Sequence, residues 1–474
     1  MSINEEWWGA ASSRFGQLID DEPSELSRYS MDAWPLQAKR RRAGAIPASP
    51  AAVFRPRETQ DVAELVIWAQ DHEVPLVAHG AGSSVTGAAI PGDGTIVVDV
   101  SRMNRILGFD AKSGHVHVEG GVLGGDLEQY LSERGRTTWF SPQSLLRSTV
   151  GGWIATAATG QFSSRFGDIS ELVSKLTVVL ASGEVVQLGS SPRGAVGPDM
   201  ANIMIGSEGA FGIVTEAWLR TYPAEPLTGL IAYGLPSVEV GLGAVREIMM
   251  SGVRPALVRL YDADEASTLA VPQPPPPAVL LMGFVGPPVV AAAERSFVQQ
   301  LLETAEGTDL GDAAVAQWMA GRYDFSSIEK LLDSEGGYAE TIEVAGTWDQ
   351  IPAIYRAMKD ELRPIVDDVF GHFSHAYVDG ISLYLIVRGR VATDENAVDV
   401  LERVWSCAME TALETGAVIS HHHGIGQARA AYLERDLGPG AMRLLTALKR
   451  ALDPTTLFHP GSLVPAEAED LAQC

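Results

Sequence analysis

Three consecutive histidines, His421, His422 and His423, run directly into Gly424-Ile425-Gly426. Imidazole is the side chain that most readily gains or loses a proton near neutral pH. Adjacent imidazoles resist simultaneous protonation, because each positive charge repels the next, so at least one stays neutral and can act as a base. The segment therefore predicts proton transfer beside a bound cofactor. The alternative is that the histidine segment is solvated or binds metal ions adventitiously.

A glycine- and serine-rich loop follows a predicted strand early in the chain. It consists of Ala78, His79, Gly80, Ala81, Gly82, Ser83 and Ser84. Small residues let backbone N–H groups approach a pyrophosphate, and serine hydroxyls add donors. The spacing is not the G-x-G-x-x-G of a nicotinamide-binding Rossmann site. Taken alone, the loop is as consistent with a tight turn as with a phosphate site.

Two further loops of the same composition follow before residue 220. The second contains Gln143, Ser144, Thr149, Gly152, Thr156 and Thr159, and the third contains Glu208, Gly209, Gly212, Ile213 and Val214. Three such loops in one domain exceed what turn formation requires. A long dinucleotide lying across the domain would use all three.

The elements that must position these loops divide the chain into four parts. Residues 1–45 are predicted to form an irregular arm, and residues 46–225 an α+β domain with short β-α-β units. In residues 226–435, strands and helices alternate with connections that suit antiparallel pairing, which predicts a ferredoxin-like α+β domain. Residues 436–474 are interpreted as a return to the first domain.

Particular elements of this prediction can be checked against the structure. We interpret the basic cluster Lys39–Arg42 of the arm as a solvated patch, and expect Thr59 to cap a helix. Helices are expected over Val238–Met250, Ala291–Thr304, Ile351–Leu362 and Asp394–Thr415, and strands over Ala256–Leu260, Thr341–Val344, Ser382–Val387 and Ala417–Ser420.

Composition excludes several classes of partner. With 35 basic and 60 acidic side chains the formal net charge is −25, which repels nucleic acid and anionic membrane surfaces. The only cysteines are Cys407 and Cys474, too few for a disulfide framework or a thiolate metal site. No export signal and no apolar stretch of the ~20 residues that span a bilayer is visible. We therefore expect a cytoplasmic protein without an integral membrane segment.

The three loops resemble the FAD-binding domain of the vanillyl-alcohol-oxidase and p-cresol-methylhydroxylase (PCMH) superfamily. Within it, the chain is most similar to the alkyldihydroxyacetonephosphate synthases. The resemblance implies FAD as cofactor, a PCMH-type FAD-binding domain of two subdomains over residues 46–225, and a cap domain for substrate over residues 226–435. Many relatives attach FAD through a histidine after the first loop's glycines. Ser83 stands there in this chain, so the resemblance implies a non-covalent flavin.

The same resemblance implies catalytic residues in the cap. Arg259 falls on an arginine important for activity, Tyr384 is similar in position to a catalytic tyrosine, and Ser420–Gly426 is the most diagnostic match. A reaction at a hydroxyl-bearing carbon above the flavin needs a group that takes a proton, and an imidazole or a phenol with a lowered pKa can do so near neutral pH. The alternatives are structural roles: Tyr384 would simply pack within a strand of the cap, and Arg259 would pair with Asp262 or Asp264.

The chain departs from the synthase pattern at the predicted substrate site. An ungapped count places Glu329 where the synthases have an arginine that grips the substrate phosphate. A carboxylate there would repel a phosphate by about 1 kcal/mol or several, depending on burial. Gln427 also replaces the lysine that usually follows the triplet motif, although Arg429 remains as a nearby cation.

Three activities therefore remain open. The favoured one is an FAD-dependent oxidoreductase acting at a hydroxyl-bearing carbon of a small or lipid-like substrate, with an unidentified electron acceptor. The second is the ether-lipid synthase reaction. The third is a D-2-hydroxy acid dehydrogenase, for which His372, His375 and Asp379-Gly380 are present.

The metal site of that third class is incomplete in this chain. Tyr384 lies one place beyond the position of its second histidine, and His422 stands where its glutamate would be, so we predict no metal. A flavin fold that binds a partner without catalysis is disfavoured by the intact Tyr384 and triplet. A homodimer is the assembly that the sequence leaves open.

Overall fold

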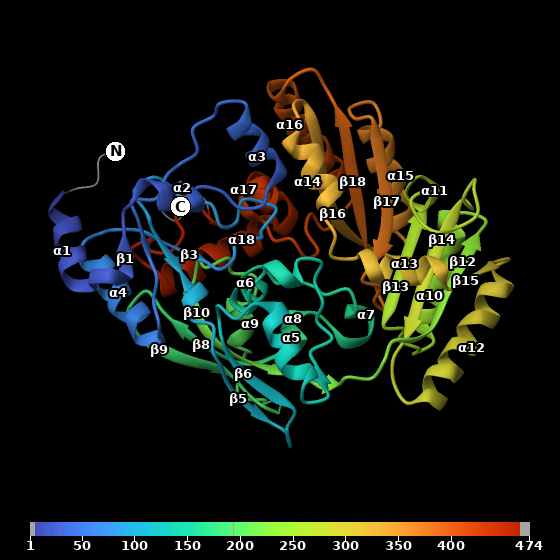
Figure 1. Ribbon diagram of the computed structural model, residues 1–474, viewed down its shortest axis with the longest axis horizontal. Coiled ribbons are helices and arrows are strands. Elements are labelled where there is room, and N and C mark those ends of the chain that lie inside the picture. Colours follow the sequence, from blue (N-terminus) through green and yellow to red (C-terminus); the bar gives the residue numbers. More distant parts are fainter. Residues whose placement is uncertain (1–4, 193, 465–474) are drawn as a thin grey trace.

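The computed structural model describes residues 5–192 and 194–464 of the chain. These residues form two α+β domains, with the strands of the cap domain standing beside the glycine-rich loops of the first domain (Figure 1). The predicted two-domain α+β fold is confirmed. In the part of the chain that the structure describes, no helix is long and apolar enough to cross a membrane.

The first domain contains two sheets, and the smaller one has the order β1-β2-β4-β3. Strands β2 and β3 run parallel to β4, whereas β1 pairs antiparallel with β2. Helix α4 packs its buried apolar residues against this sheet, and Glu58, not Thr59, takes the N-cap position. The elements are β1 (Ile19–Asp20), β2 (Ala52–Phe54), α4 (Thr59–Asp71), β3 (Leu76–His79) and β4 (Ile96–Asp99).

The larger sheet of the first domain is antiparallel, with the order β5-β6-β10-β8-β9. Short helices, with α5 and α6 prominent among them, pack apolar residues against it. Its strands are β5 (Ile106–Asp110), β6 (His115–Glu119), β8 (Val173–Val179), β9 (Val185–Gly189) and β10 (Ile213–Arg220). The helices are α5 (Gly124–Ser132), α6 (Val150–Ala155), α7 (Ser163–Phe166), α8 (Ile169–Leu172) and α9 (Ala201–Met204), and a separate strand pair is formed by β7 (Arg136–Thr137) and β11 (Tyr222–Pro223).

The cap domain is built on a seven-stranded antiparallel sheet with the order β15-β12-β14-β13-β17-β18-β16. The strands are β12 (Thr228–Leu235), β13 (Leu257–Asp262), β14 (Ala278–Phe284), β15 (Thr308–Gly311), β16 (Gly337–Thr347), β17 (Asp368–Ser374) and β18 (Gly380–Arg390). The helices are α10 (Val238–Met250), α11 (Ala263–Ala266), α12 (Pro288–Thr304), α13 (Ala313–Gly321), α14 (Ser326–Asp333), α15 (Ile351–Leu362) and α16 (Asp394–Glu414).

Alternation along the cap strands separates the two faces of this sheet. Alternate residues such as Val258 and Leu260 pack with α10, α12, α15 and α16 in the main core. The residues between them, such as Leu257 and Tyr261, lie on the opposite face with α11 and α13. That second face is the one that carries Arg259 and the other polar residues described below.

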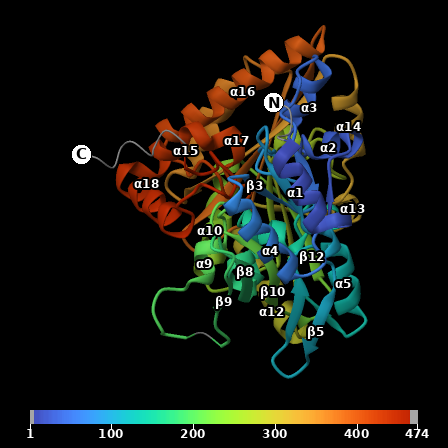
Figure 2. The ribbon, with the colours of Figure 1, turned by 90° about the vertical axis from the view of Figure 1, so that its left-hand side faces the viewer.

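The N-terminal arm is helical, so the prediction of an irregular segment is wrong. It forms α1 (Glu5–Phe15), α2 (Pro23–Tyr29) and α3 (Pro35–Arg42), and α2 and α3 each begin at a proline, whose fixed φ suits the first helical position. Figure 2 shows these helices in blue, on the other side of β3 from the red α18 (Leu433–Leu452) in that view.

The interpretation of the basic cluster as a solvated patch is wrong for Lys39, whereas the side chains of Arg40 and Arg42 are partly exposed. Lys39 is fully buried, and its Nζ lies 2.8 Å from Asp394 Oδ1 and 2.9 Å from the carbonyl oxygen of Ser334. Arg42 pairs with the same aspartate at 3.0 Å. The partners lie about 300 residues or more further along the chain, so no local pattern could reveal them.

Two further features of the structure differ from the prediction. Strand β17 was not expected, and Ala417–Ser420 is not a strand but makes one bridge, between Val418 and Ala345. Helix α18 begins at Leu433 and is interrupted at Gly438. After it the chain meets the first domain, where Leu76 bonds with the segment at Leu457–His459. Cys474 lies outside the described residues.

Candidate active site

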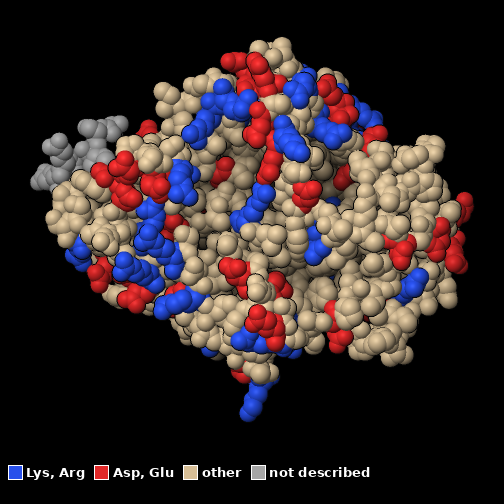
Figure 3. Space-filling view, in the orientation of Figure 1, with Lys and Arg blue, Asp and Glu red and all other residues tan. Residues whose placement is uncertain are grey.

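A cavity lies between the two domains and encloses about 1630 Å³ with its open mouth included. Every residue predicted to contact the cofactor lines it, from Ala78–Ser84 through the second loop to Val214. On the face shown in Figure 3, acidic and basic side chains are interspersed around a central hollow.

Two glycines of the first loop occupy positions that suit only a residue without a side chain. A Cβ added at Gly80 would clash with the Thr149 hydroxyl, which caps α6 by accepting a hydrogen bond from Gly152 at 3.2 Å. Gly82 has φ +64°, a left-handed conformation that favours glycine.

The cavity wall also carries polar atoms that need a partner. His79 Nε2 and Gln161 Oε1 are buried without a hydrogen-bond partner, and both residues line the cavity. Buried polar atoms are normally satisfied, so unpaired ones facing a cavity point to a bound polar ligand. Together with the glycine backbone these residues fit FAD.

The third loop connects the cofactor cavity to the histidine segment through Glu208. Its carboxylate accepts hydrogen bonds from the backbone N–H of Ile425 at 2.6 Å and of Gly426 at 3.0 Å. Its own carbonyl oxygen bonds to His459 Nδ1 at 2.9 Å. Burial raises the pKa of Glu208, although the backbone hydrogen bonds oppose this shift. Glu208 thus lines the cavity while holding the two C-terminal segments in place.

The register of the cap sheet aligns four functional side chains in one row. Tyr261 pairs with His372, His372 with Tyr384, and Tyr384 with Glu343, across β13, β17, β18 and β16. Directly opposite residues on neighbouring strands project from the same face. Arg259 lies two residues before Tyr261, and so on the same face.

Arg259 lines the cavity and is held by two side chains of that row. Its guanidinium donates to His372 Nε2 at 2.6 Å and to the Tyr261 hydroxyl at 2.7 Å. Since His372 Nε2 accepts, its proton lies on Nδ1, which is 2.9 Å from Glu265. The alternative pairing of Arg259 with Asp262 or Asp264 is not what the structure shows, because both aspartates bind Lys359.

Tyr384 lies between His372 of β17 and His423 of the histidine loop, residues 420–426. Its ring stacks on His372 with centroids 4.9 Å apart, and meets His423 edge-on at 5.6 Å. Burial raises the pKa of Tyr384 to about 12, although a side-chain hydrogen bond with Thr341 opposes the shift. A phenol with a lowered pKa, one of the two proton acceptors considered, is therefore not found at Tyr384, which is neutral near pH 7.

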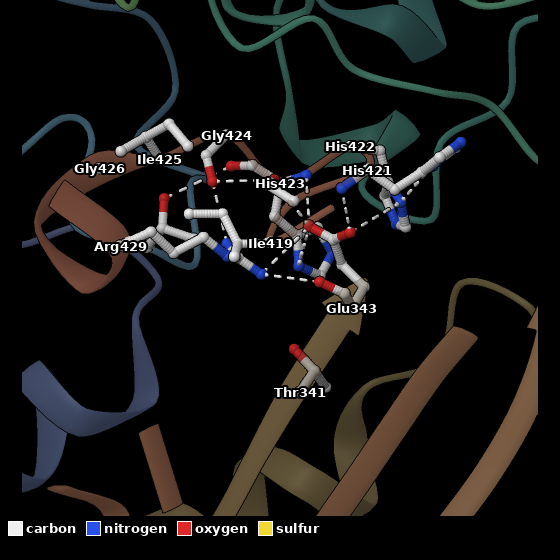
Figure 4. A network of polar contacts seen from close by, with 12 residues as sticks. Thr341, Glu343, Ile419, His421, His422, His423, Gly424, Ile425, Gly426 and Arg429 are labelled. Atoms are coloured by element: carbon white, nitrogen blue, oxygen red, sulfur yellow. Dashed lines mark hydrogen bonds and ion pairs between the residues drawn. The ribbon is translucent and has the colours of Figure 1, made fainter. Parts of the chain in front are cut away.

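The histidine loop leads into α17 (Gly426–Arg429). Its backbone surrounds the carboxylate of Glu343 (Figure 4). Glu343 accepts the backbone N–H of His421 at 2.5 Å and of His423 at 3.0 Å. The Ser420 hydroxyl adds a third bond, at 3.0 Å. Arg429 closes the arrangement, because it donates to Glu343 at 3.2 Å and to the carbonyl of Gly424 at 2.9 Å.

Two of the three histidines, His422 and His423, line the cavity, whereas His421 stacks on the ring of His375 at 5.2 Å. The Nδ1 atoms of His421 and His422 lie 3.0 Å apart, so one must donate and the other accept. Burial lowers the pKa of all three, and that of His423 falls to about 4. His423 is therefore a neutral imidazole at physiological pH.

The two predicted substrate residues lie away from the cavity wall. Arg429 is fully buried behind the histidine loop, where it supports the loop instead of facing a ligand. Glu329 lies on α14, about half exposed, and pairs with Arg147 of the second loop at 2.5 Å. Phe325, one turn before Glu329, does line the cavity.

Sequence reasoning missed the roles of three residues. His375, with φ +55°, lines the cavity and bonds to the Ser163 hydroxyl at 2.8 Å, but was considered only as a metal ligand. His372 was treated in the same way. Glu343 was not assigned a role, although a glutamate between Ile342 and Val344 in a predicted strand was a usable signal.

The chain matches two family models in succession. Residues 50–189 match an FAD binding domain, and residues 228–463 match the C-terminal domain of FAD linked oxidases. The chain is 29% identical over 462 residues to the alkyldihydroxyacetonephosphate synthase of Trypanosoma brucei brucei, covering 90% of this chain and 75% of the relative. It is 30% identical over 436 residues to an uncharacterized FAD-linked oxidoreductase of Escherichia coli O157:H7, covering 88% and 90%.

A solved structure of p-cresol methylhydroxylase with substrate bound shares the fold. It has a TM-score of 0.81 to this protein at 16% identity, and the match covers 98% of each chain. This match confirms the fold that the resemblance to the PCMH superfamily implies, and the two family models confirm the expected FAD cofactor. The chain belongs to the FAD-linked oxidases, enzymes in which an FAD-binding domain is followed by the C-terminal domain characteristic of that family.

Proposed function

We propose that the protein oxidises a hydroxyl-bearing carbon of a small or lipid-like substrate to a carbonyl. FAD, when bound, supplies the two-electron acceptor for the hydride that leaves this carbon. The hydroxyl proton goes to a histidine of the loop, and the electrons pass on to oxygen, a quinone or a protein. Ser83 stands where many relatives have the histidine that attaches FAD, which supports non-covalent binding of FAD.

One observation carries the proposal. The neutral His423 and the neutral Tyr384 face the same cavity as the three cofactor loops. A general base must be unprotonated at the operating pH and within reach of the proton it removes. We assign His423 as that base, with His422 beside it, and Tyr384 as a hydrogen-bond donor to the substrate oxygen.

Arg259 supplies the positive charge of this side of the cavity. His372 and Tyr261 hold its guanidinium, and Glu265 holds His372 in turn, so the orientation of Arg259 is fixed before substrate enters. A guanidinium presents several donors in one plane and suits a carbonyl, carboxylate or phosphate oxygen. We assign Arg259 as the group that orients the substrate beside His423.

The synthase reaction is the second candidate, and the similarity to the trypanosomal synthase over most of the chain supports it. A carboxylate at the predicted phosphate site would repel a phosphate, which is an objection to this reaction, but Glu329 lies outside the cavity lining. Its pairing with Arg147 weakens this objection, since each charge is largely compensated by the other. A D-2-hydroxy acid would be the third candidate, with its carboxylate on Arg259.

Anaerobic absorbance spectroscopy of the FAD-loaded protein distinguishes these reactions. We expect an alcohol or 2-hydroxy acid to bleach the flavin, with the colour returning only after an electron acceptor is added. Bleaching by an acyl dihydroxyacetone phosphate, reversed by a fatty alcohol without oxygen, would instead establish the synthase reaction. If none of these compounds bleached the flavin, the proposed oxidation would be wrong.

A further inference from the structure

Glu343 is the residue on which the histidine loop is built. Its side chain is fully buried, and its two oxygens accept hydrogen bonds from Ser420, from the backbone N–H of His421 and from the backbone N–H of His423. A carboxylate with these donors around it fixes the loop conformation, because each bond would leave a buried polar atom unpaired if it broke.

The same carboxylate also lies close to the rings that face the cavity. Glu343 Oε1 is 3.8 Å from His423 Nδ1, and Glu343 Oε2 is 3.8 Å from His422 Nδ1. His423 Nδ1 is buried and has no hydrogen-bond partner. The imidazole therefore has one edge toward the cavity and the other toward a negative charge.

Arg429 keeps that negative charge in place. Burial opposes ionisation of Glu343, but the charge of Arg429, the nearby His423 and His421, and the hydrogen bond from His421 together lower the pKa of Glu343. Arg429 is itself buried and stacks 5.2 Å from the Trp405 ring, so it cannot move away without leaving Glu343 uncompensated.

We propose that Glu343 is the positioning residue of the histidine loop, and that it stabilises the charge His423 acquires when it takes the substrate proton. The assignment of His423 as the base rests on the proposed function, whereas the arrangement of Glu343 and the histidine loop does not. The groups that face His423 are Glu343 on β16, Tyr384 on β18, Arg429 on α17, and His421 and His422 on its own loop.

The sign of the effect follows from these charges. Burial lowers the pKa of His423, Glu343 raises it, and Arg429 and His421 lower it. Removal of the carboxylate charge in Glu343→Gln must therefore lower the pKa of His423 further. At 3.8 Å we expect a decrease of roughly one pH unit or more.

A matched control is available on the same strand. Glu340 is also buried in β16, but its carboxylate contacts Trp405 Nε1 at 2.9 Å and does not touch the histidine loop. Burial raises the pKa of Glu340 to about 8, so glutamine closely mimics its neutral form. Glu340→Gln tests whether any effect comes from altering a buried glutamate of this strand.

The experiment follows protonation of His423 by NMR in the FAD-loaded protein with isotope-labelled histidine, using His423→Asn for assignment. At each pH we expect less protonated His423 in Glu343→Gln than in wild type, and no change in Glu340→Gln. With a substrate, we expect the acidic limb of the flavin reduction rate to move to lower pH, and the plateau to fall on the order of ten-fold.

Equal protonation of His423 in wild type and Glu343→Gln would overturn the proposal. Should Glu343→Gln fail to fold, Glu343→Asp keeps the charge at a greater distance, and we expect a smaller shift in the same direction; no shift would again overturn the proposal. Because the NMR titration needs no turnover, it gives its result even if no hydroxyl compound reduces the flavin and the proposed function fails.

Discussion

The carboxylate of Glu208 accepts a hydrogen bond from the backbone N–H of Ile425 at 2.6 Å. Glu208 belongs to the third cofactor loop, whereas Ile425 comes two residues after the last of the three histidines. The cavity and the histidine loop therefore share one buried carboxylate. A disturbance at this contact should affect both FAD binding and turnover.

Gly424→Ala tests that contact directly. Gly424 has φ +82°, and a Cβ there would lie 2.5 Å from Glu208 Oε1. A left-handed alanine costs about 1–2 kcal/mol before any clash. We expect a lower melting temperature, weaker FAD binding and at least ten-fold slower turnover. Gly440→Ala, where no atom lies within 4 Å of the added Cβ, is the control and should lower none of the three.

His423→Ala should abolish turnover while the protein stays yellow. The substitution removes the proposed base but leaves the glycine-rich loops that hold FAD. We expect a rate at least 100-fold lower, within the range of general base catalysis. The measurement pairs the reduction rate with the bound flavin absorbance, and undiminished turnover would remove His423 from the mechanism.

The stability of the folded protein should fall as the pH decreases below about 6.5. Burial lowers the pKa of His375, His421, His422 and His423, so the unfolded chain binds protons more readily than the native state. Stability is then present above the ordinary histidine pKa and is lost toward pH 4, at up to about 1.4 kcal/mol per pH unit for each histidine. Melting temperatures between pH 4 and 8 would check this, and a flat profile would contradict it.

Lys39 and Arg40 are neighbours with very different expected effects. Removal of Lys39 leaves Asp394 buried with only Arg42 as its cationic partner, and breaking a buried pair costs about 3–5 kcal/mol. Arg40 pairs with Glu402 at a largely exposed position, where such pairs contribute about 0.2–1 kcal/mol. Urea unfolding should therefore show a much larger loss for Lys39→Ala than for Arg40→Ala; equal losses would mean that the buried pair adds nothing.

Glu329→Arg tests whether the charge at position 329 selects the substrate. The change places a second cation beside Arg147 and removes an exposed ion pair, so we expect less than about 1 kcal/mol of destabilisation. Turnover of anionic compounds should increase relative to neutral ones, measured as the ratio of their kcat/KM values. If neither the native activity nor this ratio changed, selection by Glu329 would be wrong.

The glycine-rich loops that line the cavity could be picked out from the sequence because the residues that mark them lie close together in the chain. Gly80, Gly82 and Ser83 stand next to one another in the chain, and the need of a pyrophosphate for small residues and N–H donors is satisfied within a few residues. For the same reason the helices Val238–Met250 and Ile351–Leu362 were predicted with the bounds that the structure shows.

The residues that hold the histidine loop and Arg259 in place could not be located in this way. Glu343 reaches His421 and His423 across almost 80 residues of sequence, and Arg259 reaches His372 across 113. Strand β17, which carries His372, was missed entirely, although it sits at the centre of the row between β13 and β18. Such partnerships depend on strand order, which no local pattern encodes.

The contact of Lys39 with Asp394 also constrains how this protein could be recombined with its relatives. A chimera that kept this first domain and its N-terminal arm but took a foreign cap would bring an unfamiliar residue opposite a fully buried ammonium group. Only caps with an acidic residue at the start of the helix corresponding to α16 would receive that charge. The residue at the start of this one helix thus determines whether a foreign cap can pack against the N-terminal arm of this protein.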